Sequence, residues 1–445
     1  MKLEIVIAPT AATAYDFASM EIVRSNGVSL GQLDVDFRAL AALKAPEWAA
    51  DLLVLATAVY GLDKLVGRSS ARDAWTRSFM LKVPVAAPNQ WRQQRADLTA
   101  ALNFLTGDQW QLSFSKRETP VYRPKPGRRR RALARTPQSV CLLSGGLDSL
   151  IGAIDHLESN PGSNVLLVGH HDGQMPGPLD DQHSLLAAIR ATYPNRTEAL
   201  LVRVGHSGSS EEITLRSRSL VFIALGMFAA SSVDRKLPLL VPENGTMSLN
   251  VPLTPSRRGS CSTRTTHPFF IELVGRVVAG LGGNGAIQNP LLFKTKGEAV
   301  SQCLNPDLLR TVAQDSVSCA KRGHRRTWKR RRANGCGRCM PCIYRRAALH
   351  TVDLDSEAYG RDVCKGEVNI DKRDEEAPND LRACFSFLKR RHSTRELERL
   401  LITSGPLPPQ HLQLHAQVVE RAMDEIRNLL RDKGTHKIRK QAGVK

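Results

Sequence analysis

The sequence predicts an α/β fold in which a parallel sheet carries helices on both faces. Three observations support this prediction. From residue 138 onward, short apolar runs alternate with longer amphipathic runs, as strands alternate with crossover helices. The first of these strands, at residues 139–143, leads into a loop with two adjacent glycines and then into a helix. The chain has 445 residues and is 42% hydrophobic, which is sufficient for about two to four domains.

Before this α/β region, the mixture of short strand patterns and amphipathic helix patterns in residues 1–120 predicts an α+β accessory domain. No catalytic group of residues stands out in it. Residues 121–137 predict a basic, proline-rich linker, because spaced prolines and the four arginines at 128–131 oppose a packed element. The expected strands are residues 2–8, 77–85 and 110–114, and the expected helices are residues 46–60 and 96–105.

Residues 138–350 are expected to form the α/β domain itself. Ligands of open parallel sheets bind outside the carboxyl ends of the strands, so a site is expected in the loops that follow them. Residues 351–445 predict a helical region with a basic tail. The expected strands are residues 139–143, 164–170, 200–204 and 237–241, and the expected helices are residues 150–157, 181–192, 220–231, 380–390, 393–402 and 410–430.

One loop has the composition of a phosphate-binding site. Its glycines lack a Cβ, so its amides can approach an anion closely, and the following helix offers unpaired N–H groups and a positive dipole end. Its serines add hydroxyl donors, and its aspartate offers an oxygen ligand to Mg²⁺. A simple N-cap turn is the alternative, since Ser and Asp are favoured caps. We expect ATP to bind at this hexapeptide, which reads Ser144-Gly145-Gly146-Leu147-Asp148-Ser149.

Four cysteines predict a metal site. Three of them form two overlapping CxxC steps, and the fourth lies upstream. Four thiolates complete a tetrahedral Zn²⁺ site with no open position for water, so the expected role is structural. A redox centre, an iron–sulfur cluster or metal-free reduced thiols are the alternatives. The predicted ligands are Cys319, Cys336, Cys339 and Cys342.

Charge is the third signal, with a formal net charge of +20. Residues 316–352 contain eleven Lys or Arg and no Asp or Glu, and eight of these cations lie between Cys319 and Cys336. Such a segment could contact nucleic acid or an acidic protein partner. General solubility and nonspecific attraction to nucleic acid are the alternative.

The sequence contains no apolar run of membrane-spanning length, and its first residues look like a strand, not a signal peptide. We therefore expect a cytoplasmic protein with no membrane contact. In that compartment nine cysteines are expected to be thiols or metal ligands, not disulfides.

Polar residues also occur beside the other predicted strands and helices, where a common pocket is expected. Together with the glycine loop and the cysteines, these motifs resemble the PP-loop ATP pyrophosphatases, and among them 7-cyano-7-deazaguanine synthase (QueC). The resemblance covers about residues 138–350. The additional motifs that carry the resemblance are Asp172-Gly173-Gln174, Arg218 before an apolar helix and Lys296-Gly297-Glu298, while Glu243-Asn244-Gly245 also falls at the expected pocket.

The resemblance implies an AMP-forming, ATP-dependent ligase with a PP-loop fold, which uses ATP, Mg²⁺ and a structural Zn²⁺ on the four cysteines. In that family ATP adenylates the carboxylate of 7-carboxy-7-deazaguanine. Ammonia then gives an amide, and a second adenylation dehydrates the amide to the nitrile. By this comparison the glycine loop holds the β and γ phosphates, while Arg218 and Lys296 neutralise charge as pyrophosphate leaves.

This chain departs from the family pattern in several places. Residues 243–268 replace a shorter segment in which the biosynthetic enzymes recognise the deazapurine. The N-terminal domain, the basic segment and the helical C-terminus are additional. With them the chain is similar to QueC-like proteins of bacterial anti-phage systems, particularly those of the Qat type, which implies a defence role beside other proteins of the operon. The candidate substrate-binding residues are Asp172, Gln174, Glu243, Asn244, Arg257, Arg264 and His267, although loop structure, an ion pair or a structural histidine explains them almost equally well.

The leading hypothesis is ATP-dependent activation of a 7-deazaguanine acid and its transfer to an amine, on a partner protein, in anti-phage defence. One alternative is nitrile synthesis with ammonia as the nucleophile. A second alternative is a nucleic-acid-binding defence subunit in which the ATP site is regulatory.

Overall fold

The computed structural model describes residues 1–9, 18–122, 133, 135–175, 177–255, 257, 264–371 and 379–445. Most of the predicted linker, including its arginine run, lies outside the described residues. So do Cys261 and most of residues 256–263 in the segment expected to recognise the substrate.

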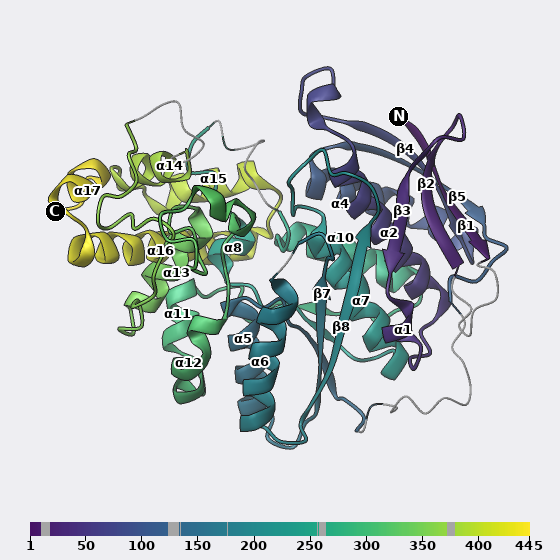
Figure 1. Ribbon diagram of the computed structural model, residues 1–445, viewed down its shortest axis with the longest axis horizontal. Coiled ribbons are helices and arrows are strands. Elements are labelled where there is room, and N and C mark those ends of the chain that lie inside the picture. Colours follow the sequence, from purple (N-terminus) through teal and green to yellow (C-terminus); the bar gives the residue numbers. More distant parts are fainter. Residues whose placement is uncertain are drawn as a thin grey trace. The chain divides into compact units, whose positions relative to one another are not determined.

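The described residues form one sheet of ten strands, most of which are parallel to their neighbours (Figure 1). The predicted α/β class is therefore confirmed. The strand order is β10 (Ile287–Gln288), β9 (Leu239–Leu240), β6 (Ser139–Leu142), β7 (Val165–His171), β8 (Thr197–His206), β3 (Ser29–Val35), β2 (Ala18–Arg24), β1 (Lys2–Pro9), β4 (Ser78–Val85) and β5 (Gln109–Lys116).

The N-terminal strands extend this sheet and do not form a sheet of their own. β3 pairs antiparallel with β8, with Leu33 opposite His206 and Val35 opposite Val204. The pairings of β3 with β2 and of β2 with β1 are also antiparallel. The boundary predicted at residue 120 therefore does not separate two sheets. Neither β2 nor β3 was expected from the sequence.

The chain forms two compact units, and neither is continuous in sequence. The first, here called the sheet unit, contains Met1–Ser144, Asn160–Val241 and Thr263–Asn289. The second, here called the helical unit, contains Gly145–Ser159, Pro242–Ser262 and Pro290–Lys445. Their edges do not coincide with the predicted boundaries at residues 120, 137 and 350, because contacts between distant segments, not chain continuity, define each unit.

Two apolar helices lie in the core of the sheet unit. α2 (Glu47–Leu65) and α7 (Arg218–Val233) pack on each other, and most residues of both are buried on every side. A helix that is hydrophobic all round belongs inside a core, which explains why neither shows a polar face. The other helices of eight or more residues described in this unit are α4 (Arg95–Thr106), α6 (Pro178–Thr192) and α10 (Pro268–Gly280).

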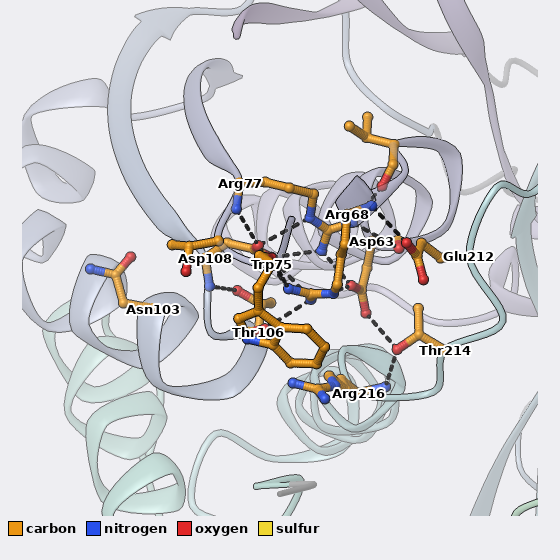
Figure 2. Close-up of polar contacts among 12 residues, drawn as sticks. Asp63, Arg68, Trp75, Arg77, Asn103, Thr106, Asp108, Glu212, Thr214 and Arg216 are labelled. Atoms are coloured by element: carbon orange, nitrogen blue, oxygen red, sulfur yellow. Dashed lines mark hydrogen bonds and ion pairs between the residues drawn. The ribbon is translucent and has the colours of Figure 1, made fainter. Parts of the chain in front are cut away.

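A network of buried charges crosses the sheet unit (Figure 2). The Arg77 guanidinium lies 2.7 Å from Asp63 and 2.6 Å from Asp108. The Arg68 guanidinium contacts the same two carboxylates at 3.3 and 3.1 Å. All four side chains are at most 7% exposed. Because each charge is matched by two partners, the network ties α2 to β4 and to the turn before β5.

Replacement of Arg77 by methionine should destabilise the sheet unit by about 3–5 kcal/mol, because Asp63 and Asp108 would each lose a partner while staying buried. Urea unfolding followed by circular dichroism measures this change. Arg72→Met removes an equal charge from an exposed position and should change stability by less than about 0.5 kcal/mol. Equal effects of the two substitutions would contradict the role given to the network.

Helices build the second unit around a separate apolar core (Figure 1, green to yellow for its C-terminal part). The three helices expected after residue 379 are confirmed as α14, α15 and α16. Ser393 and Glu396 form a capping box at the start of α15. The helices of this unit are α5 (Leu147–Ser159), α8 (Gly245–Leu249), α11 (Lys296–Ser301), α12 (Pro306–Val312), α13 (Met340–His350), α14 (Asn379–Leu388), α15 (Thr394–Ser404), α16 (Leu412–Lys433) and α17 (His436–Ala442).

Within the described residues, none of the helices is both long enough and apolar enough to cross a membrane.

Candidate functional site

The glycine loop joins β6 to α5, as the sequence predicts. β6 ends at Leu142 and α5 begins at Leu147. Gly145 has φ +87°, which a residue with a Cβ would adopt only with strain. The Gly146 carbonyl accepts the first helical hydrogen bond, from the Leu150 amide at 3.1 Å, and a second from the Ser149 hydroxyl at 2.9 Å. The loop therefore turns sharply and ends at the start of a helix.

Two other predicted site residues, Asn244 and Lys296, contact Asp148, and all three belong to the helical unit. The Oδ2 atom of Asp148 accepts hydrogen bonds from Lys296 Nζ at 2.7 Å and from Asn244 Nδ2 at 2.9 Å. All three residues are at most 7% exposed. They come from the starts of α5 and α11 and from the turn before α8, which are far apart in the sequence.

The pKa values of the two carboxyl groups at this cluster, Asp148 and Glu243, are shifted in opposite directions. Burial, the largest single influence, would raise the pKa of Asp148, but the charge of Lys296 and the hydrogen bonds of the carboxylate together outweigh it, so the pKa lies below its ordinary value. Burial, and then the neighbouring charge of Asp148, raise the pKa of Glu243 well above its ordinary value. The opposite shifts favour a state in which Asp148 carries the negative charge and Glu243 keeps its proton.

The start of α11 is fixed by two side chains of α16, Arg421 and Glu425. Arg421 lies 2.6 Å from Glu298, which also closes a capping box with Thr295. The Glu425 carboxylate accepts hydrogen bonds from the Thr295 hydroxyl and, at 3.2 Å, from the Gly297 amide. A Cβ on Gly297 would lie only 2.5 Å from Glu425 Cδ, so a side chain there would displace the Glu425 carboxyl group from its present position. These contacts hold the residues on both sides of Lys296, the first residue of α11.

The Glu425 contact predicts a pH-dependent stability. Burial raises the pKa of Glu425 from 4.5 to about 7. Because the folded state keeps this proton to a higher pH than the unfolded chain does, the stabilisation is complete below about pH 4.3 and is lost as the pH rises through 7. Relative to Glu425→Gln, the wild-type free energy of unfolding should fall by about 3 kcal/mol between pH 4.5 and 8.

Urea unfolding of both proteins at several pH values measures that difference. Glu420→Gln, at an exposed position of the same helix, should leave the wild-type profile unchanged. Parallel profiles for wild type and Glu425→Gln would contradict the prediction.

The four predicted cysteines lie together in the helical unit. Their sulfur atoms are all within 4.8 Å of one another, and those of Cys336 and Cys342 are 3.8 Å apart. A tetrahedral site with Zn–S bonds of about 2.3 Å needs S–S separations of about 3.8 Å. Backbone amides donate to the sulfurs of Cys319 and Cys336, as expected for thiolate ligands. The cluster could therefore bind a metal such as zinc.

The electrostatics of the cysteine cluster favour a cation. Hydrogen bonding with Cys319, and then with Cys339 and Cys342, lowers the pKa of Cys336. Hydrogen bonds with Cys319 and Cys336 raise the pKa of Cys339 and Cys342 well above the ordinary value. Ionisation of Cys339 and Cys342 beside the other two sulfurs is thus unfavourable unless a positive ion lies among them.

The cysteine cluster is connected to the glycine loop through one backbone hydrogen bond. The Val317 amide, two residues before Cys319, donates to the Gly145 carbonyl at 2.8 Å. The neighbouring Ser316 hydroxyl accepts from Arg345 of α13 at 2.8 Å. Arg345 also forms a buried ion pair with Glu357. The helix that begins inside the cysteine motif therefore supports the segment on which the glycine loop rests.

Two more predicted residues, Asp172 and Arg218, lie in a polar cluster of the sheet unit. Asp172 Oδ2 accepts from Lys64 Nζ at 2.6 Å and from the Tyr60 hydroxyl at 2.8 Å. Arg218 donates from Nε to His170 Nδ1 at 3.2 Å, and His170 Nε2 lies 2.9 Å from the Val204 carbonyl. Gln174, the third prediction here, donates from Nε2 to the His206 carbonyl at 2.8 Å.

His170 is held in its neutral form. Burial, and then the charge of Arg218, lower its pKa from 6.5 to about 3. Its Nδ1 accepts a hydrogen bond while Nε2 donates one, which defines the tautomer. The ring therefore orients Arg218 without carrying charge at neutral pH.

The other candidates make contacts of different kinds. Arg257 forms an ion pair with Asp380 at 2.8 Å in the helical unit. Arg264 lies over the Phe104 ring at 4.4 Å and donates to the Phe104 carbonyl in the sheet unit. His267 caps α10, since its Nδ1 accepts from the Phe269 amide at 3.2 Å. These contacts are structural, and substrate recognition by the three residues stays a prediction.

Several residues of these clusters were not expected from the sequence. Lys64 and Tyr60 belong to an N-terminal helix in which we found no catalytic group. Arg421 and Glu425 are four positions apart on an amphipathic helix, a spacing that places both on one face. That spacing was the only available signal, and it is common on helix surfaces.

Comparisons of the chain with models of known families, with curated proteins and with solved structures gave no match.

Proposed function

We propose that the protein is an AMP-forming, ATP-dependent enzyme of the PP-loop kind. The observation that carries the proposal is the meeting of Asp148, Asn244 and Lys296 at the end of the glycine loop. A buried lysine and a buried carboxylate beside a glycine loop at the start of a helix are suited to a polyphosphate and its metal ion. The resemblance of the loop to the PP-loop motif supports ATP as the source of that polyphosphate.

The residues present fit Mg²⁺. Asp148 Oδ1 is buried and has no hydrogen-bond partner among the described residues, while Oδ2 already has two. A carboxylate oxygen of this kind is a ligand that Mg²⁺ prefers, usually together with phosphate oxygens. Asp148 would hold the ion, which neutralises phosphate charge when bound. Lys296, at the start of α11, would also bind the polyphosphate.

The proposed reaction has two steps. A substrate carboxylate oxygen attacks the α-phosphorus of ATP, and the bond from that phosphorus to the bridging oxygen of the β-phosphate breaks. Pyrophosphate leaves with the bonding electrons, and an acyl-adenylate remains. An amine nitrogen then attacks the acyl carbon, AMP leaves, and the nitrogen loses a proton to a base. Fixed cations near the loop, Lys296 among them, stabilise the charge that develops on pyrophosphate.

We assign the cysteine cluster a structural Zn²⁺ ion. All four ligand positions would be filled by sulfur, so neither water nor substrate could reach the metal. Its effect on the reaction would be indirect, through the Val317 amide and the Gly145 carbonyl.

The proposed substrate is a 7-deazaguanine carboxylic acid, and the proposed setting is anti-phage defence alongside other proteins of the operon, one of which carries the amine. The motif resemblance supports both. The residues outside the resemblance, at the N-terminus and after residue 351, could hold a protein acceptor.

The test incubates the purified protein with ATP, Mg²⁺ and 7-carboxy-7-deazaguanine, first alone, then with ammonia, and then with each operon partner. AMP, pyrophosphate and intact protein mass are measured. The proposal predicts AMP formation and an increase in partner mass that corresponds to the acyl group. Nitrile formation with ammonia alone would favour the synthase alternative, and absence of AMP in every arm would refute the proposal.

A further inference from the structure

The helical unit displays a strongly basic loop between two of its predicted metal ligands. Eight Lys or Arg lie between Cys319 and Cys336, and residues 316–352 contain no Asp or Glu. Three further arginines in that range, at 338, 345 and 346, are only 4–5% exposed. Two of those three form ion pairs with carboxylates, and the third donates to the Thr327 hydroxyl. These three arginines are therefore structural, and the surface charge of the loop comes from the eight.

The exposed cations of the loop outnumber the carboxylates near them. Arg330 lies 2.7 Å from Glu367, and Lys329 lies 3.9 Å from the same residue. The other three exposed cations have no carboxylate partner among the described residues. They are Arg326, Arg331 and Arg332.

The backbone that carries these cations is fixed. Trp328 is 3% exposed and packs with Cys336, Cys339 and Cys342. The Arg330 amide donates to the Gly360 carbonyl at 3.1 Å, and the Cys336 amide donates to Cys319 Sγ at 3.3 Å. The charges are thus presented by a closed, anchored loop, and little chain entropy would be lost when an anion binds.

The surface lacks what a protein partner normally needs. Protein interfaces are built around buried aromatic or aliphatic anchors, with charges at the rim. Residues 316–352 are all described, and no large hydrophobic side chain among them is exposed. The one tryptophan of the loop is already buried in its own fold. Charge is the dominant recognition element of this segment, which favours a regular polyanion over a folded protein.

We propose that this loop binds the phosphate backbone of nucleic acid, with Arg326, Arg331 and Arg332 as its main contacts. Arginine guanidinium groups donate paired hydrogen bonds to phosphate oxygens, and six of the eight loop cations are arginines. Because contacts to phosphate carry no sequence information, binding is expected to depend little on sequence. DNA and RNA share the phosphodiester chemistry and are separate arms of the test. This proposal does not depend on the adenylation reaction.

The test measures fluorescence anisotropy of labelled 30-nucleotide single-stranded DNA, duplex DNA and single-stranded RNA with the full-length protein from 50 to 300 mM salt. The triple variant Arg326→Ala, Arg331→Ala and Arg332→Ala should bind about 10- to 100-fold more weakly at 0.1 M salt. The slope of log affinity against log salt should become shallower by about 3, that is about 1 per lost phosphate contact.

A matched control removes three exposed cations elsewhere in the helical unit, by Arg395→Ala, Arg399→Ala and Lys440→Ala. Its slope should change by less than about 1 if the basic loop is the site. Thermal melting and metal content of both variants must equal those of the wild type, which excludes misfolding as the cause.

Three outcomes would overturn the proposal. The first is absence of binding by the wild type at 50 mM salt. The second is an equal loss of affinity in the two triple variants, because net charge alone would then be responsible. The third is binding of poly-glutamate as tight as that of nucleic acid at the same salt, which would indicate an acidic protein partner.

Discussion

Asp148→Asn is expected to lower the rate of AMP formation by about 10²–10³-fold. The substitution keeps the shape of the side chain but removes the charge that pairs with Lys296 at 2.7 Å. It also replaces the unpartnered Oδ1 with a group that cannot bind Mg²⁺ as a carboxylate does. Both losses act on the charged polyphosphate, so the maximal rate should fall more than the affinity for ATP.

The measurement is pyrophosphate release at saturating ATP and Mg²⁺, together with the ATP dissociation constant. Asp307→Asn on α12 removes an exposed carboxylate of the same unit and should leave the rate within about twofold of wild type. If Asp148→Asn retained more than a tenth of the wild-type rate, the role proposed for this carboxylate would be wrong.

Removal of the metal should have the largest effect on stability. Structural Zn²⁺ contributes about 10–16 kcal/mol of apparent binding free energy, comparable with the whole stability of a typical domain, about 5–15 kcal/mol. A loss of even 5 kcal/mol would lower the melting temperature of a unit of this size by about 10–20 °C. Chelation, or Cys339→Ser, should therefore produce an early melting transition, and Zn²⁺ should restore the chelated wild type.

Metal analysis and differential scanning calorimetry provide the test, with one zinc ion expected per chain. Cys303→Ser is the matched control, because Cys303 is also buried in the helical unit but lies outside the cluster. The control should keep its zinc. A wild-type protein that contained no metal, or that melted identically after chelation, would exclude a structural zinc site.

The features that were predicted best are those that depend on residues close together in the sequence. The CxxC steps place three sulfurs together whatever the rest of the fold does, and the structure confirms that Cys319 joins them. The strand, glycine loop and helix at residues 139–159 were also predicted correctly, because Gly145 and Gly146 interrupt an otherwise apolar run.

Features that depend on distant pairing were missed. β3 has three apolar side chains among its seven residues, Leu30, Leu33 and Val35, and it is stabilised by pairing with β8, which follows more than a hundred residues later. Lys64 looks like an exposed residue at a helix end, yet it is buried against Asp172. Such contacts have no local pattern, since a partner far along the chain decides whether a charge is buried.

The hydrogen bond from Val317 to Gly145 has a consequence for any preparation of the protein. Val317 is held in place by a segment whose own fold depends on the cysteine cluster. Molecules that leave the ribosome in zinc-poor cells would then carry an unsupported glycine loop. Specific activity should therefore follow metal occupancy linearly, and the fraction of chains that can be titrated with ATP should equal the fraction that contain zinc.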